Sequence, residues 1–545
     1  MQPLPLPAAL IGLSLALVVP PLHPPSPAAT RQPHYLETPV GKKPRVVITA
    51  DPELDDLNSL IRYILHASDY RTEGLIYASS QYHWTGDGTG RTQNLPNRQY
   101  NRNGRQLCPC TSWRWNPTER FIDDVVDAYE QAYPNLRIHN PEYPAPADLR
   151  ARIRWGNVQF EGEMARDTEG SNLIESLLLD DIDEPIYLHA WGGQSTINRA
   201  LKSIEEQYAA TPQWPSIRAK VVSKAVIHPS GDQDETGATY LKPNWPDIRY
   251  GNGGGATAAL GYGAQANAAP EDRVYYSAAW MEAHVLSKGR LGALQRVWGD
   301  GRRMVDGDIF DYFHLSGFTA EALWAQGYDV WTAPMPRGEF LAEGDTGTFL
   351  SLLDNGLQGW RQENRRQPNE YATAARIQPR APGAGPRPIG APPHILALRG
   401  LPPASTTTGN GATAHRPPGR FLGPLMNDLA GRLSWAVTPD VTRANHYPTL
   451  TLRTARLTAR PGEAVTIAAT VADPDHDVVS LKWWRFDGYG TYAGAVTVDT
   501  FDDETAIVHV PADATAGDTI HIVAEATDGG TPPLTRYARA VLTVR

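Results

Sequence analysis

The segment RVVITADPELDD, residues 45–56, joins a run of β-branched residues to a cluster of acids. The β-branched run predicts a buried strand, and the strand ends at Pro52 because proline lacks the N–H that a ladder requires. Apolar residues then recur at helical spacing from position 57 to position 65, which predicts a helix. Asp51, Asp55 and Asp56 therefore lie where a strand gives way to a helix.

The position of these three aspartates suggests a ligand site. In an open α/β sheet, ligands bind at the carboxyl edge, where strands pass into helices. Carboxylates packed together repel one another, and a hard divalent cation with oxygen ligands is the simplest compensation. A helix N-terminus also favours carboxylates, so capping alone is the alternative interpretation. One aspartate is ordinary at a cap, whereas three within six positions favour a cation.

Predicted strands and helices alternate through most of the first 448 residues. Further strands are expected at 72–77, 185–191, 220–227 and 328–332. Apolar spacing predicts helices around 121–129, 173–178, 197–204, 349–353 and 425–433. This alternation predicts an α/β fold, with a mainly parallel sheet flanked by helices. Polar residues follow several of the strands, which brings His83, His228, Asp234 and Asp345 into consideration as site residues.

Two changes of pattern divide the chain. Residues 376–420 are rich in Pro, Gly, Ala, Ser and Thr, which indicates a disordered insertion or linker within a domain spanning 45–448. From 449 to 545 the apolar period becomes two, with turn residues between short runs, and this predicts an all-β immunoglobulin-like sandwich. Its strands are expected at 450–457, 464–471, 479–484, 506–510, 520–526 and 538–544.

One turn of the expected sandwich is acidic. Asp473, Asp475 and Asp477 alternate there with other residues. They either bind calcium between modules or form a solvated acidic turn, since aspartate is common in turns.

The N-terminus and the net charge bear on location and partners. Residues 1–29 are interpreted as a signal peptide, because 8–19 are apolar but too few to span a bilayer, and small residues follow. Residues 30–44 form a polar lead-in. Although residues 1–7 lack Lys and Arg, we expect a secreted or periplasmic protein without a membrane anchor.

The net charge of −10 argues against a nucleic acid polymer as partner, because such binders carry a basic stripe.

Cys108 and Cys110 are the two cysteines of the chain. Two thiolates cannot complete a structural zinc site, and a disulfide across one residue is strained. They are interpreted either as unreactive thiols or as one local bridge in an exported protein, and neither is assigned a catalytic role.

The acidic segment also carries a family resemblance. Asp51-Pro-Glu-Leu-Asp-Asp56 resembles the DxDPGxDD motif of calcium-dependent nucleoside hydrolases. Other stretches resemble a branch of secreted nucleoside-hydrolase-like proteins, some of which are known as cellulose-binding proteins. These stretches are SSQYHWTGDG (79–88), CTSWRW (110–115), HAWGG (189–193), EGDT (343–346), ANH (444–446) and TDGGTPPLTRY (527–537). The resemblance covers nearly all of the chain after the leader.

The resemblance implies a Ca²⁺ ion held by Asp51, Asp56, Asp345 and the backbone carbonyl of Trp191. It further implies that Asp51 is the general base that takes a proton from water, and that Asp55 accepts a hydrogen bond from a sugar hydroxyl. Water would attack the anomeric carbon while carboxylates stabilise the oxocarbenium charge.

Other substrate contacts are also expected from the resemblance. Asn244 lies in a place comparable to the segment that binds ribose in nucleoside hydrolases. His83 is expected to contact the substrate as well. The leaving group needs a proton donor, for which His83, His228 and Asp234 are candidates by loop position.

The chain departs from the nucleoside hydrolase motif at several positions. Thr49 replaces the first Asp, Glu53 replaces the Gly, and Ser79-Ser80 replaces a Gly-Asn pair. The metal ligands therefore transfer better than the substrate contacts.

Two functions are consistent with this pattern. The first is an exported, calcium-dependent hydrolase of an N-glycosyl or related glycosidic bond, acting on a nucleoside or on a glycoside from plant polysaccharide. The second is a carbohydrate-binding or cellulose-binding protein with weak or no turnover. The sequence gives no prediction of the oligomeric state.

Overall fold

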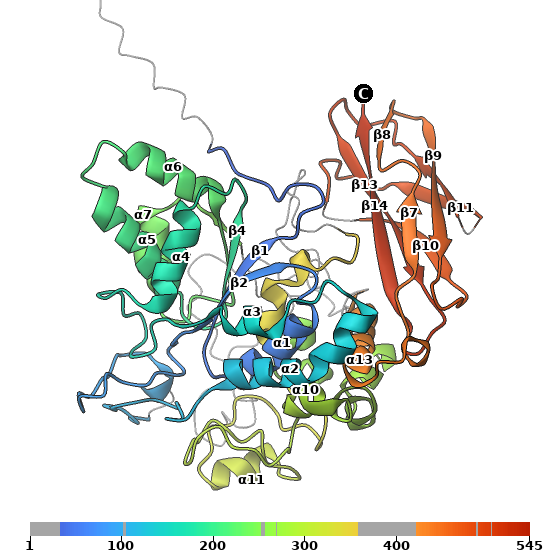
Figure 1. The fold of residues 1–545 in the computed structure, drawn as a ribbon. Coiled ribbons are helices and arrows are strands. Elements are labelled where there is room, and N and C mark those ends of the chain that lie inside the picture. Colours follow the sequence, from blue (N-terminus) through green and yellow to red (C-terminus); the bar gives the residue numbers. More distant parts are fainter. Residues whose placement is uncertain are drawn as a thin grey trace, which may run out of the picture.

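The computed structural model describes residues 33–101, 105–251, 257–268, 270–357, 421–486, 489–502 and 504–545. The expected signal peptide (1–29) and the Pro-rich segment 376–420 lie outside these ranges. Figure 1 shows two parts, an α/β domain and a β-sandwich that packs beside it. None of the helices in the described ranges is long and apolar enough to cross a membrane.

A parallel sheet of six strands forms the centre of the α/β domain, in the order β3-β2-β1-β4-β5-β6. All five strand pairs are parallel. The strands are β1 (Arg45–Ala50), β2 (Arg71–Tyr77), β3 (Ile153–Trp155), β4 (Ile186–Ala190), β5 (Ala225–Pro229) and β6 (Arg249–Tyr250). The chain reverses strand order beside β1, so β1 and β4 are the neighbours between which a ligand site is expected.

Helices cover both faces of this sheet. The longer helices are α1 (Leu54–Leu65), α2 (Phe121–His139), α4 (Glu169–Leu179), α5 (Ser195–Tyr208), α6 (Trp214–Lys224) and α13 (Leu422–Val437). The shorter ones are α3 (Pro146–Arg150), α7 (Lys242–Asn244), α8 (Thr257–Leu260), α9 (Ala278–Met281), α10 (Gly289–Leu294) and α11 (Ala320–Ala325). Val46 and Ile48 of β1 pack with α1, α2 and α13, whereas Val47 packs with α4, α5 and α6 on the opposite face (Figure 1).

Burial on both faces explains why the β1 sequence forms a central strand. Its six residues are all buried because each face of the sheet meets a layer of helices. The run of β-branched side chains satisfies both layers at once, as is typical of parallel sheets. The expected α/β fold with a mainly parallel sheet is confirmed.

Three predicted elements are wrong in detail. The expected strand 220–227 is helical up to Lys224, and β5 begins only at Ala225. Residues 328–332 form an irregular, partly buried segment, in which the N–H groups of Trp331 and Thr332 donate to the Tyr312 hydroxyl. The expected helix at 349–353 is instead a pair of 3₁₀ turns, at Gly344–Thr348 and Leu350–Leu352. Short apolar runs have no period that separates these alternatives.

Two four-stranded sheets form the C-terminal sandwich, β10-β13-β14-β8 and β11-β12-β9-β7. Their strands are β7 (Thr449–Leu452), β8 (Arg456–Ala459), β9 (Ala464–Ala472), β10 (Ser480–Arg485), β11 (Thr497–Asp502), β12 (Thr505–His509), β13 (Thr519–Thr527) and β14 (Thr535–Val544). Ile467, Val508, Ile522 and Leu542 belong to the core between the sheets. The all-β sandwich is confirmed, although the expected strand 450–457 is two strands in different sheets.

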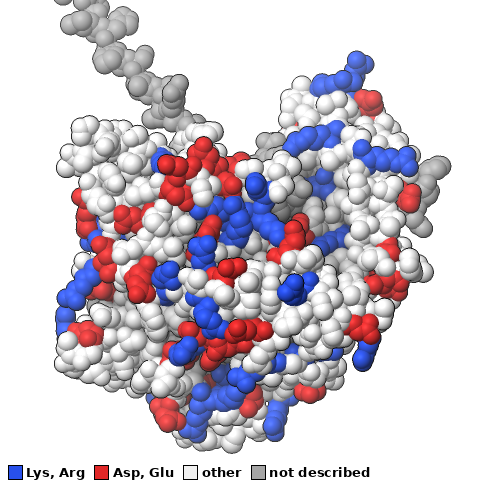
Figure 2. All heavy atoms as spheres, in the orientation of Figure 1, with Lys and Arg blue, Asp and Glu red and all other residues white. Residues whose placement is uncertain are grey.

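Contacts from α13 and the following linker hold the two domains together. Phe421, which precedes α13, packs against Trp484 and Tyr537 of the sandwich. The Arg536 guanidinium lies 3.8 Å from the ring centroid of Tyr447. On the face of the molecule seen in Figure 2, acidic and basic side chains are interspersed across both domains.

A candidate metal and substrate site at the carboxyl edge of the sheet

Asp51 and Asp56 are positioned by the transition from β1 to α1. The backbone turns sharply after Asp51, where the Glu53 N–H donates to the Asp51 carbonyl at 2.8 Å. Asp56 lies in the first turn of α1, and its Oδ1 accepts a hydrogen bond from the Asp51 N–H at 3.1 Å. Both carboxylates are almost completely buried, with 0% and 2% of their surface exposed. The local sequence therefore fixes two carboxylates at the carboxyl edge.

Asp345 joins this pair from a distant part of the chain. It lies in the 3₁₀ turn at 344–348, and its carboxyl group contacts that of Asp56. The turn approaches α1 closely, because a Cβ at Gly344 would lie 2.3 Å from Asp55 Oδ2. The bidentate ion pair between Arg62 and the adjacent Glu343, both completely buried, anchors the turn to α1.

Asp51 is oriented by two side chains from the loop after β2. Its Oδ2 accepts hydrogen bonds from the Ser80 hydroxyl and from His83 Nδ1, the latter at 2.9 Å. Its Oδ1 is buried and has no hydrogen-bond partner among the described residues. His83 Nε2 is likewise buried without a partner in those residues. These two atoms leave hydrogen-bonding positions in the buried site that a ligand, a water or an ion could fill.

Trp191 supplies a backbone oxygen near the end of β4. Its N–H donates to the Thr49 carbonyl of β1, and its indole donates to the Thr348 hydroxyl, both at 2.8 Å. Its carbonyl accepts a hydrogen bond from Gln233 Nε2 at 2.6 Å. A carbonyl oxygen has a second lone pair, so this bond leaves one position for a cation.

The carboxylates of the site repel one another. Burial, together with the charge of Asp345, raises the pKa of Asp56 well above its ordinary value. Burial and the charge of Asp55 do the same for Asp345 and for Glu53. Burial raises the pKa of Asp55 to about 6, against a hydrogen bond from the Tyr262 hydroxyl that lowers it. A divalent cation would remove this repulsion.

Two overlapping groups of residues at the start of α1 bring their ligand atoms close enough for a metal site. Ligand atoms of Asp51, Glu53 and His83 lie within 4.8 Å of one another, as do those of Glu53, Asp55 and Asp56. In the described ranges, no Lys or Arg side chain forms an ion pair with the aspartates of the site, which are Asp51, Asp55, Asp56 and Asp345. The donor set is dominated by carboxylates, which suits a hard cation such as Ca²⁺. The acidic residues at the start of α1 could therefore hold a metal ion.

His83 is held as a neutral hydrogen-bond acceptor toward the site. Burial and the nearby positive charge of Arg114 lower the pKa of His83. The carboxylate of Asp51 can only accept, so the proton of the neutral ring is assigned to Nδ1. His83 Nε2 then presents a lone pair, which can accept a hydrogen bond from a hydroxyl group.

The structure does not bring every expected residue to this site. Asn244 is exposed on α7, with its amide donating to the Tyr240 carbonyl and its carbonyl accepting from Arg218 of α6. Because α6 leads into the amino end of β5, Asn244 lies on the side of the sheet away from the site. Spacing along the chain could not reveal this, since Asn244 ends a helical segment in which a π-helical turn at 237–241 continues into α7.

The other two expected proton donors are engaged in structural contacts. Asp234 accepts hydrogen bonds from the Ser195 N–H at the start of α5 and from both the N–H and the hydroxyl of Thr236. His228 Nδ1 contacts the Thr348 carbonyl at 3.1 Å. Asp234 thus serves as a capping residue for α5.

Several site residues were not predicted. Ser80 and Glu53 were noted only as departures from the family motif, yet Ser80 orients Asp51 and Glu53 lies among the carboxylates. Tyr262, which donates to Asp55 Oδ1 at 3.1 Å, had no sequence pattern that marked it.

The loop that carries Ser80 and His83 is stiffened by its own contacts. Trp84 pairs with Trp113 through a β-bridge. Cys108 and Cys110 are joined in a disulfide, so the local bridge is the correct alternative. Arg114, beyond this pair, forms an ion pair with Asp308.

Comparisons with known proteins show which family the chain resembles. A family model described as "Cellulose-binding Sde182, nucleoside hydrolase-like domain" matches residues 45–366. A second model, "Cellulose-binding protein Sde0182, C-terminal domain", matches residues 464–544. No curated protein matches the chain.

Among solved structures, a nucleoside hydrolase-related hypothetical protein from Saccharophagus degradans, described as associated with carbohydrate metabolism, has a TM-score of 0.60. It is 23% identical, and the match covers 92% of this chain and 100% of that chain, so it shows a shared fold. The titin M3 domain matches 18% of this chain and 96% of its own, with 17% identity and a TM-score of 0.14. The resemblance expected from the sequence is confirmed: the first family model spans more than half of the 545 residues, and the chain belongs to the family of cellulose-binding Sde182 proteins with a nucleoside hydrolase-like domain.

Proposed function

We propose that this protein is an exported, calcium-dependent hydrolase that cleaves an N-glycosyl or related glycosidic bond of a small nucleoside or glycoside. The observation that carries the proposal is the state of Asp51. One of its oxygens is fixed by Ser80 and His83, while the other is buried and has no partner in the described chain. An oriented carboxylate with one free oxygen is what a general base requires.

Asp51, Asp56, Asp345 and the Trp191 carbonyl would hold the ion. When bound, Ca²⁺ would neutralise these carboxylates and offer coordination positions to sugar hydroxyls. The buried Arg62–Glu343 pair supports this assignment because it fixes the turn that carries Asp345.

The remaining residues would orient the sugar and the water. Asp51 Oδ1 would take a proton from water, while Ser80 and His83 keep the carboxylate from rotating. Asp55, half-buried and held by Tyr262, would accept a hydrogen bond from a sugar hydroxyl. Glu53 adds negative charge where positive charge develops on the sugar, and such charge stabilises an oxocarbenium-like transition state.

The lack of a positioned proton donor in the described chain favours substrates whose leaving group departs without being protonated. Asp234 is occupied by α5, and His83 presents a lone pair rather than a proton, so neither is positioned as an acid. We therefore expect faster turnover with leaving groups that need no proton, such as p-nitrophenoxide, than with a purine or pyrimidine base.

Carbohydrate binding with little turnover is the second candidate. It is favoured by the family description as cellulose-binding and by the same lack of a positioned acid among the described residues. In this case the carboxylate cluster and its ion would bind a sugar diol without hydrolysis.

A substrate screen separates the two candidates. Release of p-nitrophenol from aryl ribosides and glucosides, and of base from nucleosides, would be measured with calcium and with EGTA. Asp51→Asn should lower turnover by about 10²-fold or more, because a general base contributes that much. Asp127→Asn, which changes an exposed carboxylate on α2, is the matched control. Equal rates for wild type, Asp51→Asn and buffer would reject the hydrolase.

Binding to cellulose and oligosaccharides would be measured on the same proteins. Retention by cellulose that falls with EGTA and with Asp56→Asn would support a binding role for the carboxylate site. Export would be tested by N-terminal sequencing of the mature protein from the culture medium or periplasm. An intact Met1 would contradict cleavage of residues 1–29.

A further inference from the structure

The second acidic cluster of the molecule lies in the loop between β9 and β10. Ligand oxygens of Asp473, Asp475 and Asp477 lie within 4.8 Å of one another. The N–H groups of Asp475 and Asp477 both donate to Asp473 Oδ1, at 2.9 and 3.0 Å. Asp473 Oδ2 is buried and has no hydrogen-bond partner among the described residues. A turn of this kind alone identifies no ligand, so the neighbouring residues decide its role.

Asp528 faces this loop from the end of β13. It is only 4% exposed, and its Oδ1 accepts three hydrogen bonds, from the Asn445 amide and the N–H groups of Gly530 and Leu534. Its Oδ2 is buried without a partner in the described ranges. Burial raises the pKa of Asp528, and the nearby charge of Asp473 raises it further.

The strand pairing confirms that the two loops adjoin. Ser480 of β10 pairs with Thr527 of β13, so residues just before Ser480 and just after Thr527 lie side by side. Continued by one residue, this register places Asp528 opposite Val479, two residues from Asp477. A Cβ at Gly529 would lie 3.4 Å from the Val478 carbonyl oxygen.

Asn445 reaches the same place from the linker between α13 and β7. Its amide donates to Asp528 Oδ1 at 2.9 Å and to the Pro532 carbonyl at 2.8 Å. Asn445 is 7% exposed, and its Oδ1 is buried without a partner among the described residues. It sits directly on Gly530, where a Cβ would lie 2.2 Å from that oxygen. The Asn445 side chain, which is bound to Asp528, thus carries a third buried oxygen without a partner in the described ranges.

Positive charge at this cluster is scarce. In the described chain, the basic side chain that contacts these aspartates is His446, whose Nδ1 lies 3.1 Å from Asp475 Oδ2. His446 also contacts His139 of α2 at 2.9 Å, and His139 contacts the Thr438 carbonyl at 2.7 Å. One imidazole does not offset four carboxylates, of which that of Asp528 is buried, and a buried charge needs compensation.

We propose that a Ca²⁺ ion binds between the two domains, held by Asp473, Asp475, Asp477, Asp528 and the amide oxygen of Asn445. Three of the oxygens involved are buried and unpartnered, and all the donors are oxygens, as Ca²⁺ prefers. This site is separate from the carboxylate cluster at α1 and does not depend on the proposed hydrolase activity.

Such an ion would fix the sandwich against the α/β domain. Asn445 belongs to the linker, while the four aspartates belong to two loops of the sandwich, so one ion would bridge both. Removal of the ion should therefore loosen the linker before it affects either core.

Calcium binding to the full chain, stripped with EGTA, tests the proposal. Equilibrium dialysis with radioactive calcium up to about 1 mM covers the affinities usual for extracellular sites. Asp477→Asn and Asp528→Asn should each remove one bound ion, or weaken it at least 10-fold. Asp56→Asn should leave this ion in place, which distinguishes it from the site at α1.

Asp513→Asn is the matched control. Asp513 is an exposed sandwich carboxylate that accepts a hydrogen bond from Tyr492, and an amide can keep that bond. It precedes the opposite end of β13, about 30 Å from Asp528 by the length of nine strand residues. The Asp477 side chain has no hydrogen-bond partner in the described structure, so Asp477→Asn keeps the test valid if Asp528→Asn does not fold.

Terbium provides an independent readout. The Trp435 indole donates to the Asn445 carbonyl at 2.7 Å and can sensitise Tb³⁺ bound beside it. Sensitised emission should appear in wild type and Asp513→Asn, be displaced by calcium, and be lost in Asp477→Asn. Limited proteolysis should cut 438–449 faster without calcium. Unchanged calcium stoichiometry in both Asp477→Asn and Asp528→Asn would overturn the proposal.

Discussion

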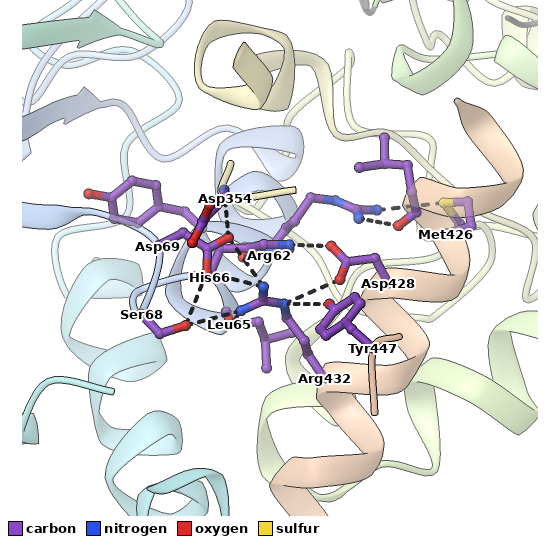
Figure 3. Close-up of polar contacts among 12 residues, drawn as sticks. Arg62, Leu65, His66, Ser68, Asp69, Asp354, Met426, Asp428, Arg432 and Tyr447 are labelled. Carbon is purple, nitrogen blue, oxygen red and sulfur yellow. Dashed lines mark hydrogen bonds and ion pairs between the residues drawn. The ribbon is translucent and has the colours of Figure 1, made fainter. Parts of the chain in front are cut away.

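The two ends of helix α1 differ in whether the chain itself compensates their buried charges. At its start, Asp55 and Asp56 lie among other carboxylates, and no Lys or Arg of the described chain forms an ion pair with them. Near its end, Arg62 pairs with Glu343, and His66 contacts Asp428 of α13. Figure 3 shows this second region, where hydrogen bonds and ion pairs connect α1 to α13.

The contrast separates structural charges from functional ones. Burial acts to raise the pKa of Asp428, but the charges of His66 and Arg432 outweigh burial and lower it. Asp69, which Arg432 contacts at 3.1 Å, also has a lowered pKa despite its burial. Asp56 has no such partner, and its pKa is raised. A buried acid that the chain itself compensates holds the fold, whereas one that the chain leaves uncompensated is expected to meet a ligand.

The largest loss of unfolding free energy is expected from removing a compensating cation at the end of α1. Arg62→Met leaves Glu343 completely buried without its cation, and such a loss costs about 3–5 kcal/mol of unfolding free energy. Chemical denaturation of the full chain measures it. Because Glu343 precedes Asp345, calcium affinity at the α1 site should fall as well.

A surface arginine provides the control for this variant. Arg150 pairs with Asp127 and Glu130 in an exposed position, so Arg150→Met should cost less than about 1 kcal/mol. The double variant Arg62→Met/Glu343→Met should recover part of the loss, because it removes the unpaired charge. An equal loss for Arg62→Met and Arg150→Met would show that the buried pair does not stabilise the helix end.

The two ends should also respond oppositely to pH. Raised pKa values, such as the value of about 6 for Asp55, give stability that is full below about pH 4 and is lost as pH rises through the folded pKa. Lowered pKa values, such as that of Asp428, give stability that is present above about pH 4. This stability is lost as the pH falls through the folded pKa.

The metal-free protein should therefore be most stable near about pH 4–5, and about 2–3 kcal/mol less stable at neutral pH, since one pKa unit is about 1.4 kcal/mol. Saturating calcium should move the maximum toward neutral pH, because the ion binds ionised carboxylates. Denaturation across this pH range, with EGTA or calcium, measures both curves. Identical curves would contradict a cation at the start of α1.

A smaller effect is expected from removing one charge at the uncompensated end. Asp56→Asn keeps the acceptor for the Asp51 N–H but removes repulsion with Asp345. The metal-free variant should be more stable than wild type by about 1–2 kcal/mol, since one pKa unit is about 1.4 kcal/mol, while calcium should stabilise it less. Thermal unfolding with and without calcium measures both. A variant less stable than wild type in EGTA would mean that Asp56 is structural.

The sequence predicts what is local and misses what is distant. The β1–α1 segment contains its own strand, breaker and helix pattern, so Asp51, Asp55 and Asp56 could be placed from it. Asp345 could be paired with them only through the family motif, because 289 residues separate it from Asp56. The Arg62–Glu343 pair, 281 residues apart, has no local pattern at all.

The positions of the hydrogen-bonding partners follow the same rule. Ser80 and His83 could be noted from the sequence because they follow a predicted strand. Their convergence on Asp51 depends on the loop that ends at Trp113, which no local pattern predicts. Tyr262 reaches Asp55 across 207 residues, and nothing in the sequence near Tyr262 marks that contact.

The smallest effect is expected at Asn244, which the sequence assigned to the substrate site and the structure places elsewhere. Asn244→Ala removes one exposed hydrogen bond to the Tyr240 carbonyl and keeps the backbone bond to Arg218. The unfolding free energy should change by less than about 0.5 kcal/mol, as for most surface substitutions. Calcium affinity and any turnover should match wild type, whereas Asp55→Asn should weaken sugar binding. The contradicting outcome would be a loss of substrate affinity in Asn244→Ala at unchanged stability. It would mean that the substrate extends around the sheet to the amino side of β6, beyond the carboxylate cluster.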